Sequence, residues 1–295
     1  MENFLSYLTI GLANGFIYTL LAIGFVLIYK SSGIFNLALG ELTIFGAYLF
    51  YAFVTQLKLP ILAGLIGSII LMGLLGWTVH YGVFRPLVGQ PILALLVLTL
   101  ALGGLLRGLM MLFWGSDWLT SPTLISSTES IQLGVISVSH IHIAFVGISL
   151  LLVGLLALFF QRTKTGLAMM VVADDTVVAR SLGIKINQIL SICWCIAAIA
   201  AAMGGILLTN VIGVSYFYIE LGFKSMAVAL VGGLQSLWGL VIVGPLMGII
   251  EYMAIGYINP LVGGDAEIVG PWIVLLLVLL VRPFGFFGWR KIERV

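Results

Sequence analysis

Five ionisable side chains lie within runs of apolar residues long enough to cross a membrane: Glu41, Arg107, Glu220, Lys224 and Glu251. A charge in hydrocarbon is costly, so such residues usually pair, face a cavity or reach the surface. We expect Arg107 and Lys224 to extend to the outer surface, and Glu220 and Lys224, one helical turn apart, can pair. Glu41 and Glu251 can cap broken helices, bond to free backbone N–H groups or line a polar pathway.

The sequence around Glu41, FNLALGE, indicates irregular backbone within a span. An Asn and a Gly before an acid suggest a helix start or a non-helical segment. Backbone of that kind at membrane depth must be buried in protein or line a cavity. The residues predicted to line a translocation pathway are therefore Asn36, Gly40, Glu41, Gly232, Gly233 and Glu251.

Residue groups that would support catalysis or metal binding are weak. The sequence contains neither GxxxxGK[ST] nor GxGxxG, so nucleotide energy would require another chain. His140 and His142 are better explained as interfacial histidines than as metal ligands. Cys193 and Cys195 point to different sides of a helix, which disfavours a disulfide or a metal pair. We predict no catalytic and no metal-binding residue, because a convincing Ser/His/Asp grouping is also lacking.

The composition is that of a membrane protein. Apolar residues make up 62% of the 295 residues, charged residues only 8%, and the mean hydropathy is +1.24. A soluble domain would carry roughly a quarter charged residues. Apolar runs of about 20 residues suit membrane-spanning helices. The predicted spans are 5–29, 33–53, 60–83, 91–113, 141–160, 189–212, 221–234, 237–257 and 268–281.

These spans predict an all-α polytopic membrane protein with about 8–9 transmembrane helices. The whole chain, 1–295, forms one transmembrane domain, residues 114–139 form an external loop, and the seventh span is short enough to be re-entrant. A weak echo between 35–51 and 230–252, each with a Gly-bearing break before a span containing an acid, suggests an inverted repeat.

Charge asymmetry predicts the orientation. Placing segment 161–188 in the cytoplasm puts most of the thirteen basic residues inside, as the positive-inside rule requires. The N-terminus is then external and the C-terminus cytoplasmic. The basic residues placed inside are Lys30, Arg85, Arg162, Lys164, Arg180, Lys185, Arg282, Arg290, Lys291 and Arg294.

Segment 161–188 is polar yet has apolar residues at close to helical spacing. Asp174 and Asp175 can open a short helix, Arg180 lies in its last turn and Gly183 can end it. We expect one or two short helices beneath the membrane. Helices that rest on lipid present Lys, Arg and bulky apolar anchors. The alanines and paired aspartates of this segment instead favour docking into a groove on another protein.

The same segment, GLAMMVVADDTVVARSLGIKINQI, resembles the cytoplasmic coupling segment of permease subunits of branched-chain amino acid (Liv-type) ABC importers. IFNLALGELTIFGAY resembles that family's INFAHGE block, and VALVGGLQSLWGLVIVGPLMGIIE resembles its Gly-rich C-terminal block. VFRPLVGQP and VLLVRPFGFFG match its two RP turns. The matches stay in order over residues 11 to 288 and suit the H-type subunit. Leu39 departs from the family's usual His, so no role of that imidazole carries over.

The resemblance implies a permease subunit that moves branched-chain amino acids inward across a bacterial or archaeal plasma membrane and is not itself an enzyme. It implies a second related permease, giving a heterodimer, two ATPase subunits that bind ATP and Mg, and an external solute-binding protein. No cofactor is expected in this chain, and no nucleic acid. The residues expected to couple to the ATPase are Gly166, Ala173, Asp174, Asp175, Arg180 and Gly183.

Other functions stay open at this point. The same architecture can serve urea, short-chain amides or aromatic acids, and nothing in the sequence separates these cargoes from leucine, isoleucine and valine. An ion-coupled secondary transporter would need titrating acids in its pathway, for which Glu41 and Glu251 qualify. Such a transporter would work without the docking segment.

Overall fold

The computed structural model describes residues 2–87, 90–120, 130–133 and 136–288. Its helices are α1 (Glu2–Ser32), α2 (Leu39–Tyr51), α3 (Ile61–Val79), α4 (Ile92–Trp114), α5 (His140–Arg162), α6 (Lys164–Asp174), α7 (Thr176–Ser181), α8 (Ile186–Ile212), α9 (Ile219–Gly232), α10 (Leu237–Met253), α11 (Asn259–Val262) and α12 (Ala266–Val281). The π-helical turns η1 (Ala52–Gln56), η2 (His80–Phe84) and η5 (Ala254–Ile258) follow α2, α3 and α10. Two 3₁₀ turns, η3 (Arg85–Leu87) and η4 (Tyr216–Tyr218), complete the helical elements.

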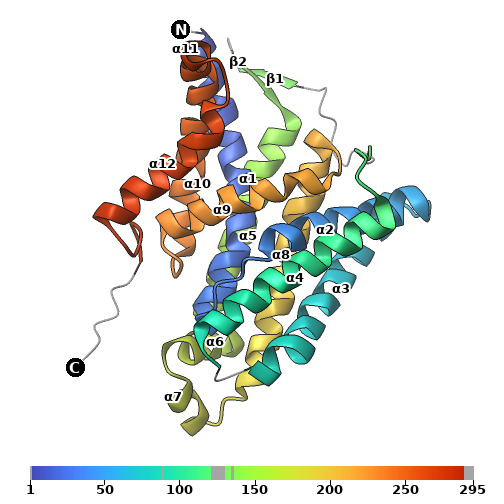
Figure 1. The fold of residues 1–295 in the computed structure, drawn as a ribbon, viewed down its shortest axis with the longest axis vertical. Helices are drawn as coiled ribbons and strands as arrows, with labels where there is room; N and C mark the ends of the chain where they lie inside the picture. The colour runs from blue at the N-terminus through green and yellow to red at the C-terminus, as the bar shows by residue number, and fades with distance from the viewer. Residues whose placement is uncertain (1, 88–89, 121–129, 134–135, 289–295) are drawn as a thin grey trace.

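The chain folds as an all-α membrane protein, as predicted (Figure 1). Six helical segments in the described part are long and apolar enough to cross a membrane: 4–32, 61–87, 92–114, 140–162, 186–209 and 237–262. A helix satisfies its own backbone hydrogen bonds, which hydrocarbon requires of any spanning segment. Each predicted span coincides with a helix, and the three short ones are α2, α9 and α12.

The predicted external loop, 114–139, is described only in part. Its last residues form a two-stranded antiparallel hairpin, β1 (Ser130–Leu133) with β2 (Ile136–Ser139). Leu119 forms a β-bridge with Val214, which follows the end of α8. Residues 121–129 and 134–135 lie outside the described part of the chain.

The core is built around α1, which makes its most extensive contact with α10. Small residues allow this close approach: a Cβ on Gly15 would lie 2.4 Å from the Cα of Pro245, and one on Gly11 would lie 2.8 Å from the oxygen of Gly248. Helix α8 packs against α3 in the same manner, with Gly76 against the backbone of Trp194. Without a hydrophobic force between helices in lipid, such close packing supplies the association.

Both long central helices end in the same way. α1 is followed by Gly33 at φ +68° and α8 by Gly213 at φ +75°, and each glycine N–H bonds the carbonyl four residues earlier. A left-handed residue at this position favours glycine. The chain then runs without α-helix through 33–38 and 213–218 before α2 and α9 begin. Irregular backbone before a short helix is therefore present in both halves.

The two halves correspond in inverted order. α1, α2, α3 and α4 match α8, α9, α10 and α12, because α1 packs on α10 as α8 packs on α3, and π turns follow both α3 and α10. Figure 1 shows α1 and α8 running in opposite directions. The sequence echo paired 35–51 with 230–252, which equates α2 with α10, and this pairing is wrong. The packing instead equates α2 with α9. A similar glycine content in two segments does not by itself give them the same place in the fold.

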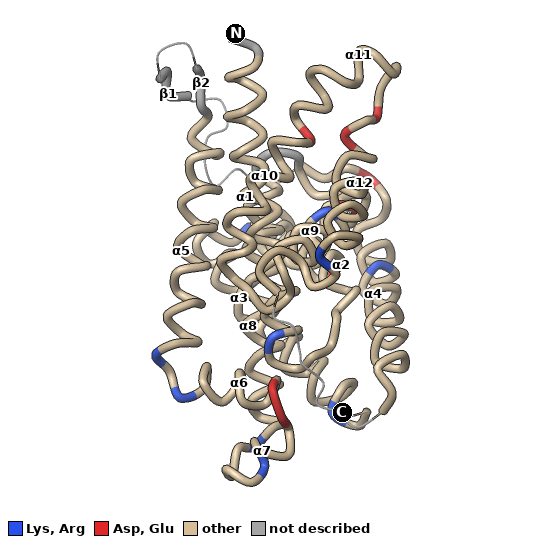
Figure 2. Tube along the Cα trace, turned by 90° about the vertical axis from the view of Figure 1, so that its left-hand side faces the viewer, with Lys and Arg blue, Asp and Glu red and all other residues tan. Residues whose placement is uncertain are grey.

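Basic residues gather at the end of the bundle that carries α6 and α7 (Figure 2). The Lys30 ammonium lies 4.8 Å from the ring centre of Phe160, which joins the ends of α1 and α5. Arg85, Arg180 and Lys185 line one hollow at this same end. The distribution suits the positive-inside rule. The cytoplasmic orientation of this end stays a prediction.

Candidate translocation and coupling sites

Glu251 is the centre of a buried polar cluster that joins three helices. Its Oε1 lies 2.5 Å from the Lys224 ammonium of α9, and its Oε2 accepts a 2.5 Å hydrogen bond from the Tyr18 hydroxyl of α1. The neighbouring Tyr252 hydroxyl accepts a 3.0 Å hydrogen bond from the Asn14 amide of α1. Each oxygen of the buried carboxylate therefore has a donor, as a buried charge requires.

Glu41 makes a simpler pair. One carboxylate oxygen accepts a 3.0 Å hydrogen bond from the Arg107 guanidinium of α4, whereas Oε2 is buried without a partner among the described residues. Glu41 lies in the first turn of α2, where the helix dipole favours a negative charge. A Cβ on Gly103 would lie 3.1 Å from the Glu41 carboxyl carbon, so α4 approaches this acid closely.

These pairs correct two expectations, both about Lys224. Lys224 does not extend freely to the surface, since its side chain is only 15% exposed and binds Glu251. It does not form an ion pair with Glu220 either, although the two residues are one turn apart. Arg107 keeps 46% of its side chain exposed, which agrees with a side chain that reaches the surface, and it also pairs with Glu41. In each case an acid from another helix supplies a charge partner inside the protein.

The predicted pathway residues do not form one cluster. Asn36 is buried, and its Oδ1 accepts from the Ala38 N–H at 3.0 Å, which orders the segment before α2. Gly40 meets α9, where a Cβ on Gly222 would lie 2.4 Å from the Gly40 Cα. Glu41 follows directly on α2.

Gly232 and Gly233 lie at the other end of α9. There the Gly233 N–H bonds the Leu230 carbonyl, and a Cβ on Gly233 would lie 2.5 Å from the Gly288 nitrogen. The role of all six residues in a pathway stays a prediction. Gly222 was not predicted to be a site residue, although the sequence places it two residues before Lys224 in an apolar helix.

Helices α6 and α7 are fixed by well-formed ends. The Thr163 hydroxyl accepts from the Gly166 N–H at 2.9 Å and caps α6. Gly166 also packs directly on the end of α5, since a Cβ there would lie 2.3 Å from the Phe159 oxygen. Asp175 caps α7 by accepting from the Val177 N–H at 2.7 Å. Gly183, at φ +74°, follows α7 and confirms the expected end of that helix.

Helix α7 has one buried side and an apolar exposed side. Ala179 is fully buried and packs with Val172, Ile186 and Leu190 in a small core of its own. Asp174, Asp175, Arg180 and Gly183 are exposed, and Ala173 is partly exposed. The exposed apolar side chains of α7 and its end, which sequence reasoning did not select, are Val177, Val178 and Leu182. An apolar patch at the tip of a helical pair fits a protein partner.

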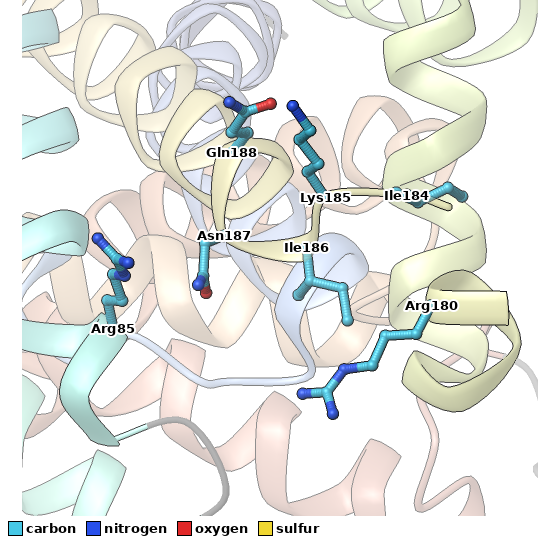
Figure 3. A pocket seen from close by; sticks show the side chains of 7 residues that line it. All are labelled: Arg85, Arg180, Ile184, Lys185, Ile186, Asn187 and Gln188. Carbon is cyan, nitrogen blue, oxygen red and sulfur yellow. The ribbon is translucent and has the colours of Figure 1, made fainter. Parts of the chain in front are cut away.

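A basic hollow of about 520 Å³ lies beside α7 (Figure 3). Arg85, Arg180 and Lys185 contribute its positive charges, and the start of α8 forms its wall. No ion pair within 4.0 Å joins these three residues to an acid in the described part of the chain. Among the described residues no group of three or more His, Cys, Asp or Glu side chains could hold a metal ion.

Comparisons with known proteins agree with this architecture. The permease subunit LivH of the high-affinity branched-chain amino acid transport system of Salmonella typhimurium is 28% identical over 99% of this chain and 98% of its own length. The corresponding BraD protein of Pseudomonas aeruginosa is 30% identical over 99% and 98%. PsaBC from Streptococcus pneumoniae, solved in complex with Fab, shares the fold with a TM-score of 0.51 at 13% identity, covering 94% of this chain and 92% of that chain. The family described as "Branched-chain amino acid transport system / permease component" matches residues 7–281. This chain belongs to that family and is a multi-pass permease component.

Proposed function

We propose that this chain is one membrane subunit of an ATP-driven importer that moves branched-chain amino acids inward. A second related permease would complete the pathway as a heterodimer, and an external solute-binding protein would deliver the cargo. Two separate ATPase subunits would bind ATP and Mg, since the chain has no phosphate-binding glycine motif. Family membership and the cargo of the LivH and BraD relatives support this function.

The observation that carries the proposal is the α6–α7 pair. It lies at the end of the bundle that is rich in basic residues (Figure 2), with capped ends and an exposed apolar tip. α7 contacts the bundle through Ala179 and its small core, so a displacement of the tip of α7 would be transmitted to α8. ATP-driven movement of an ATPase groove would in this way bias two states of the bundle.

The two buried acids favour this mechanism over ion-coupled transport. A proton- or cation-coupled carrier needs acids that are free to bind the ion during transport. Glu41 and Glu251 each have a basic partner within 3.0 Å, and Glu251 also accepts from Tyr18. Their charges are already balanced inside the protein, which supports a structural role.

The test is leucine uptake by proteoliposomes that contain both permeases and the ATPase, with binding protein and ATP supplied. We expect Val177→Asp and Leu182→Asp to abolish ATPase co-purification and to lower uptake at least about tenfold, because a charge enters a desolvated contact. Leu57→Asp is the matched control: it is also exposed but lies between η1 and α3, away from α7, and should keep the ATPase bound.

Cargo is tested separately by competition. Excess isoleucine or valine should suppress leucine uptake, whereas urea, acetamide and phenylacetate should not. Suppression by one of these three would move the cargo assignment to that class. Uptake without any ATPase, or ATPase binding that survives both Asp substitutions, would overturn the coupling role of α7.

A further inference from the structure

The basic hollow beside α7 lies at one boundary of the membrane-spanning region. The apolar segment 61–87, which contains α3, ends two residues after Arg85, and the apolar segment 186–209 of α8 begins directly after Lys185. Arg180 of α7 is the third cation that lines the hollow. Two of the three cations therefore lie where membrane helices end, which is the depth at which lipids carry their headgroups.

The hollow is lined by groups that bind anions. The side-chain amides of Asn187 and Gln188 lie beside the three cations, and none of the described residues that line the hollow is acidic. Helix α8 begins here, and its N-cap residue is Lys185, whose side chain has no acceptor to cap the first N–H groups. In Figure 3, Arg85 and Arg180 lie on opposite sides of this first turn. The cations thus surround the hollow rather than meet at one point, which suits a headgroup of several atoms better than a single small ion.

An exposed apolar face leads from the membrane interior to this hollow. It is formed by side chains of α3 and η2 at helical spacing: Ile70, Leu74, Trp77 and Tyr81. The Trp77 and Tyr81 rings stack with their centres 5.4 Å apart, and the Arg85 guanidinium lies 4.6 Å from the centre of the Tyr81 ring. Trp and Tyr gather at the lipid interface. The charge of Arg85 therefore lies directly beyond a surface that an acyl chain can cover.

We propose that the hollow binds the headgroup of an anionic phospholipid, that is, a phosphodiester without an amine. Basic pockets between membrane helices bind such headgroups, and a guanidinium matches the geometry of phosphate oxygens. The acyl chains would cover the exposed face of α3. A zwitterionic headgroup would be held less tightly, because its amine would find no acidic partner in the lining. The bound lipid would join α7 to the ends of α3 and α8.

The test measures lipid retention by the purified chain in detergent micelles, with the bound lipids counted by native mass spectrometry. Phosphatidylglycerol is compared with phosphatidylcholine that carries the same acyl chains. We expect phosphatidylglycerol to bind at least about tenfold more tightly, and it alone should raise the unfolding temperature. The double variant Arg85→Gln with Lys185→Gln should weaken this binding at least about tenfold and abolish the rise in unfolding temperature.

The double variant Arg162→Gln with Lys164→Gln is the matched control. Both residues are exposed where α5 meets α6, at the same end of the bundle, and neither lines the hollow. The control removes the same amount of charge, yet phosphatidylglycerol affinity should stay unchanged. Equal retention of the two lipids, or an equal loss of affinity in the control, would reduce the binding to general surface attraction and overturn the site. Thermal unfolding without lipid confirms that each variant is folded.

Two further measurements separate the lipid from other anions. Glycerol 1-phosphate at the concentration of the lipid should not displace it, and displacement would assign the hollow to a free phosphate compound. Assembly of the whole transporter should leave the lipid bound, and its loss on assembly would assign the hollow to the ATPase interface. This last measurement rests on the proposed function. Lipid retention by the single chain does not, so a failure of either proposal can be told from a failure of the other.

Discussion

Glu41 and Glu251 are both buried acids on short or broken helices, yet their partners lie in different surroundings. Lys224 is 15% exposed and shares Glu251 with the Tyr18 hydroxyl, so the charge is enclosed by α1, α9 and α10. Arg107 is 46% exposed on α4, and one oxygen of Glu41 has no partner among the described residues. The Glu251 cluster is therefore enclosed by protein, whereas the Glu41 pair has an exposed basic partner.

The difference indicates different energetic roles. A charge pair deep in the protein has lost its solvation, so removing one partner strands the other. A pair with one exposed member keeps access to its surroundings and contributes less. We infer that the Glu251 cluster fastens α1, α9 and α10 together, whereas the Glu41 pair positions α4 against α2 with some freedom.

The largest expected effect is that of Lys224→Met. The substitution leaves the Glu251 carboxylate buried with only the Tyr18 bond, and should lower the free energy of unfolding by about 3–5 kcal/mol. The measurement is unfolding of the purified chain in mixed detergent micelles, followed by circular dichroism.

The double variant Lys224→Met with Glu251→Gln is the control for that effect. It removes both charges, so most of the lost stability should return, because the stranded charge is the main cost. If the double variant were no more stable than Lys224→Met, the loss would come from packing rather than from charge.

Tyr18→Phe should have the next largest effect. It removes one hydrogen bond to a buried carboxylate and keeps the ring, so we expect a loss of about 2 kcal/mol in the same unfolding measurement. In the Lys224→Met background the cost should grow, because Tyr18 is then the remaining donor. Equal costs in both backgrounds would mean that the two donors act independently.

Sequence patterns predicted the helices well and the partners of the acids poorly. Length and hydropathy identify membrane helices because hydrocarbon allows few other structures. Each of the nine predicted spans overlaps a described helix, and six helical segments are long and apolar enough to cross a membrane. The ends of α7 followed from Asp175 and Gly183 by local capping chemistry. Glu251, however, pairs with residues 27 and 233 positions away, and Glu41 with one 66 positions away. No local pattern encodes those separations.

Arg107→Met tests the ion pair whose basic partner is exposed. Glu41 is itself only 7% exposed, but the Arg107 side chain is 46% exposed, so its removal opens a route for water to the Glu41 carboxylate. The loss should therefore be about 1 kcal/mol, well below the cost of Lys224→Met. The unfolding measurement is the same for both variants. Equal losses would mean that water does not reach the Glu41 carboxylate when the guanidinium is missing, and the distinction between the two pairs would fail.

The smallest effect is the difference between two adjacent glycines of α4. Each Gly→Ala change favours a helix by up to about 1 kcal/mol. Gly104 faces open space, so Gly104→Ala should stabilise the chain, whereas a Cβ at Gly103 would lie 3.1 Å from the Glu41 carboxyl carbon. We expect Gly103→Ala to be less stable than Gly104→Ala by about 0.5–1 kcal/mol, because Glu41 must shift to relieve the contact. The stability difference between the two variants should become smaller in a Glu41→Ala background, because that carboxyl group is absent there. A stability difference that persists there would mean that the crowding at Gly103 comes from the helix backbones. Glu41 would then have no role in placing α4.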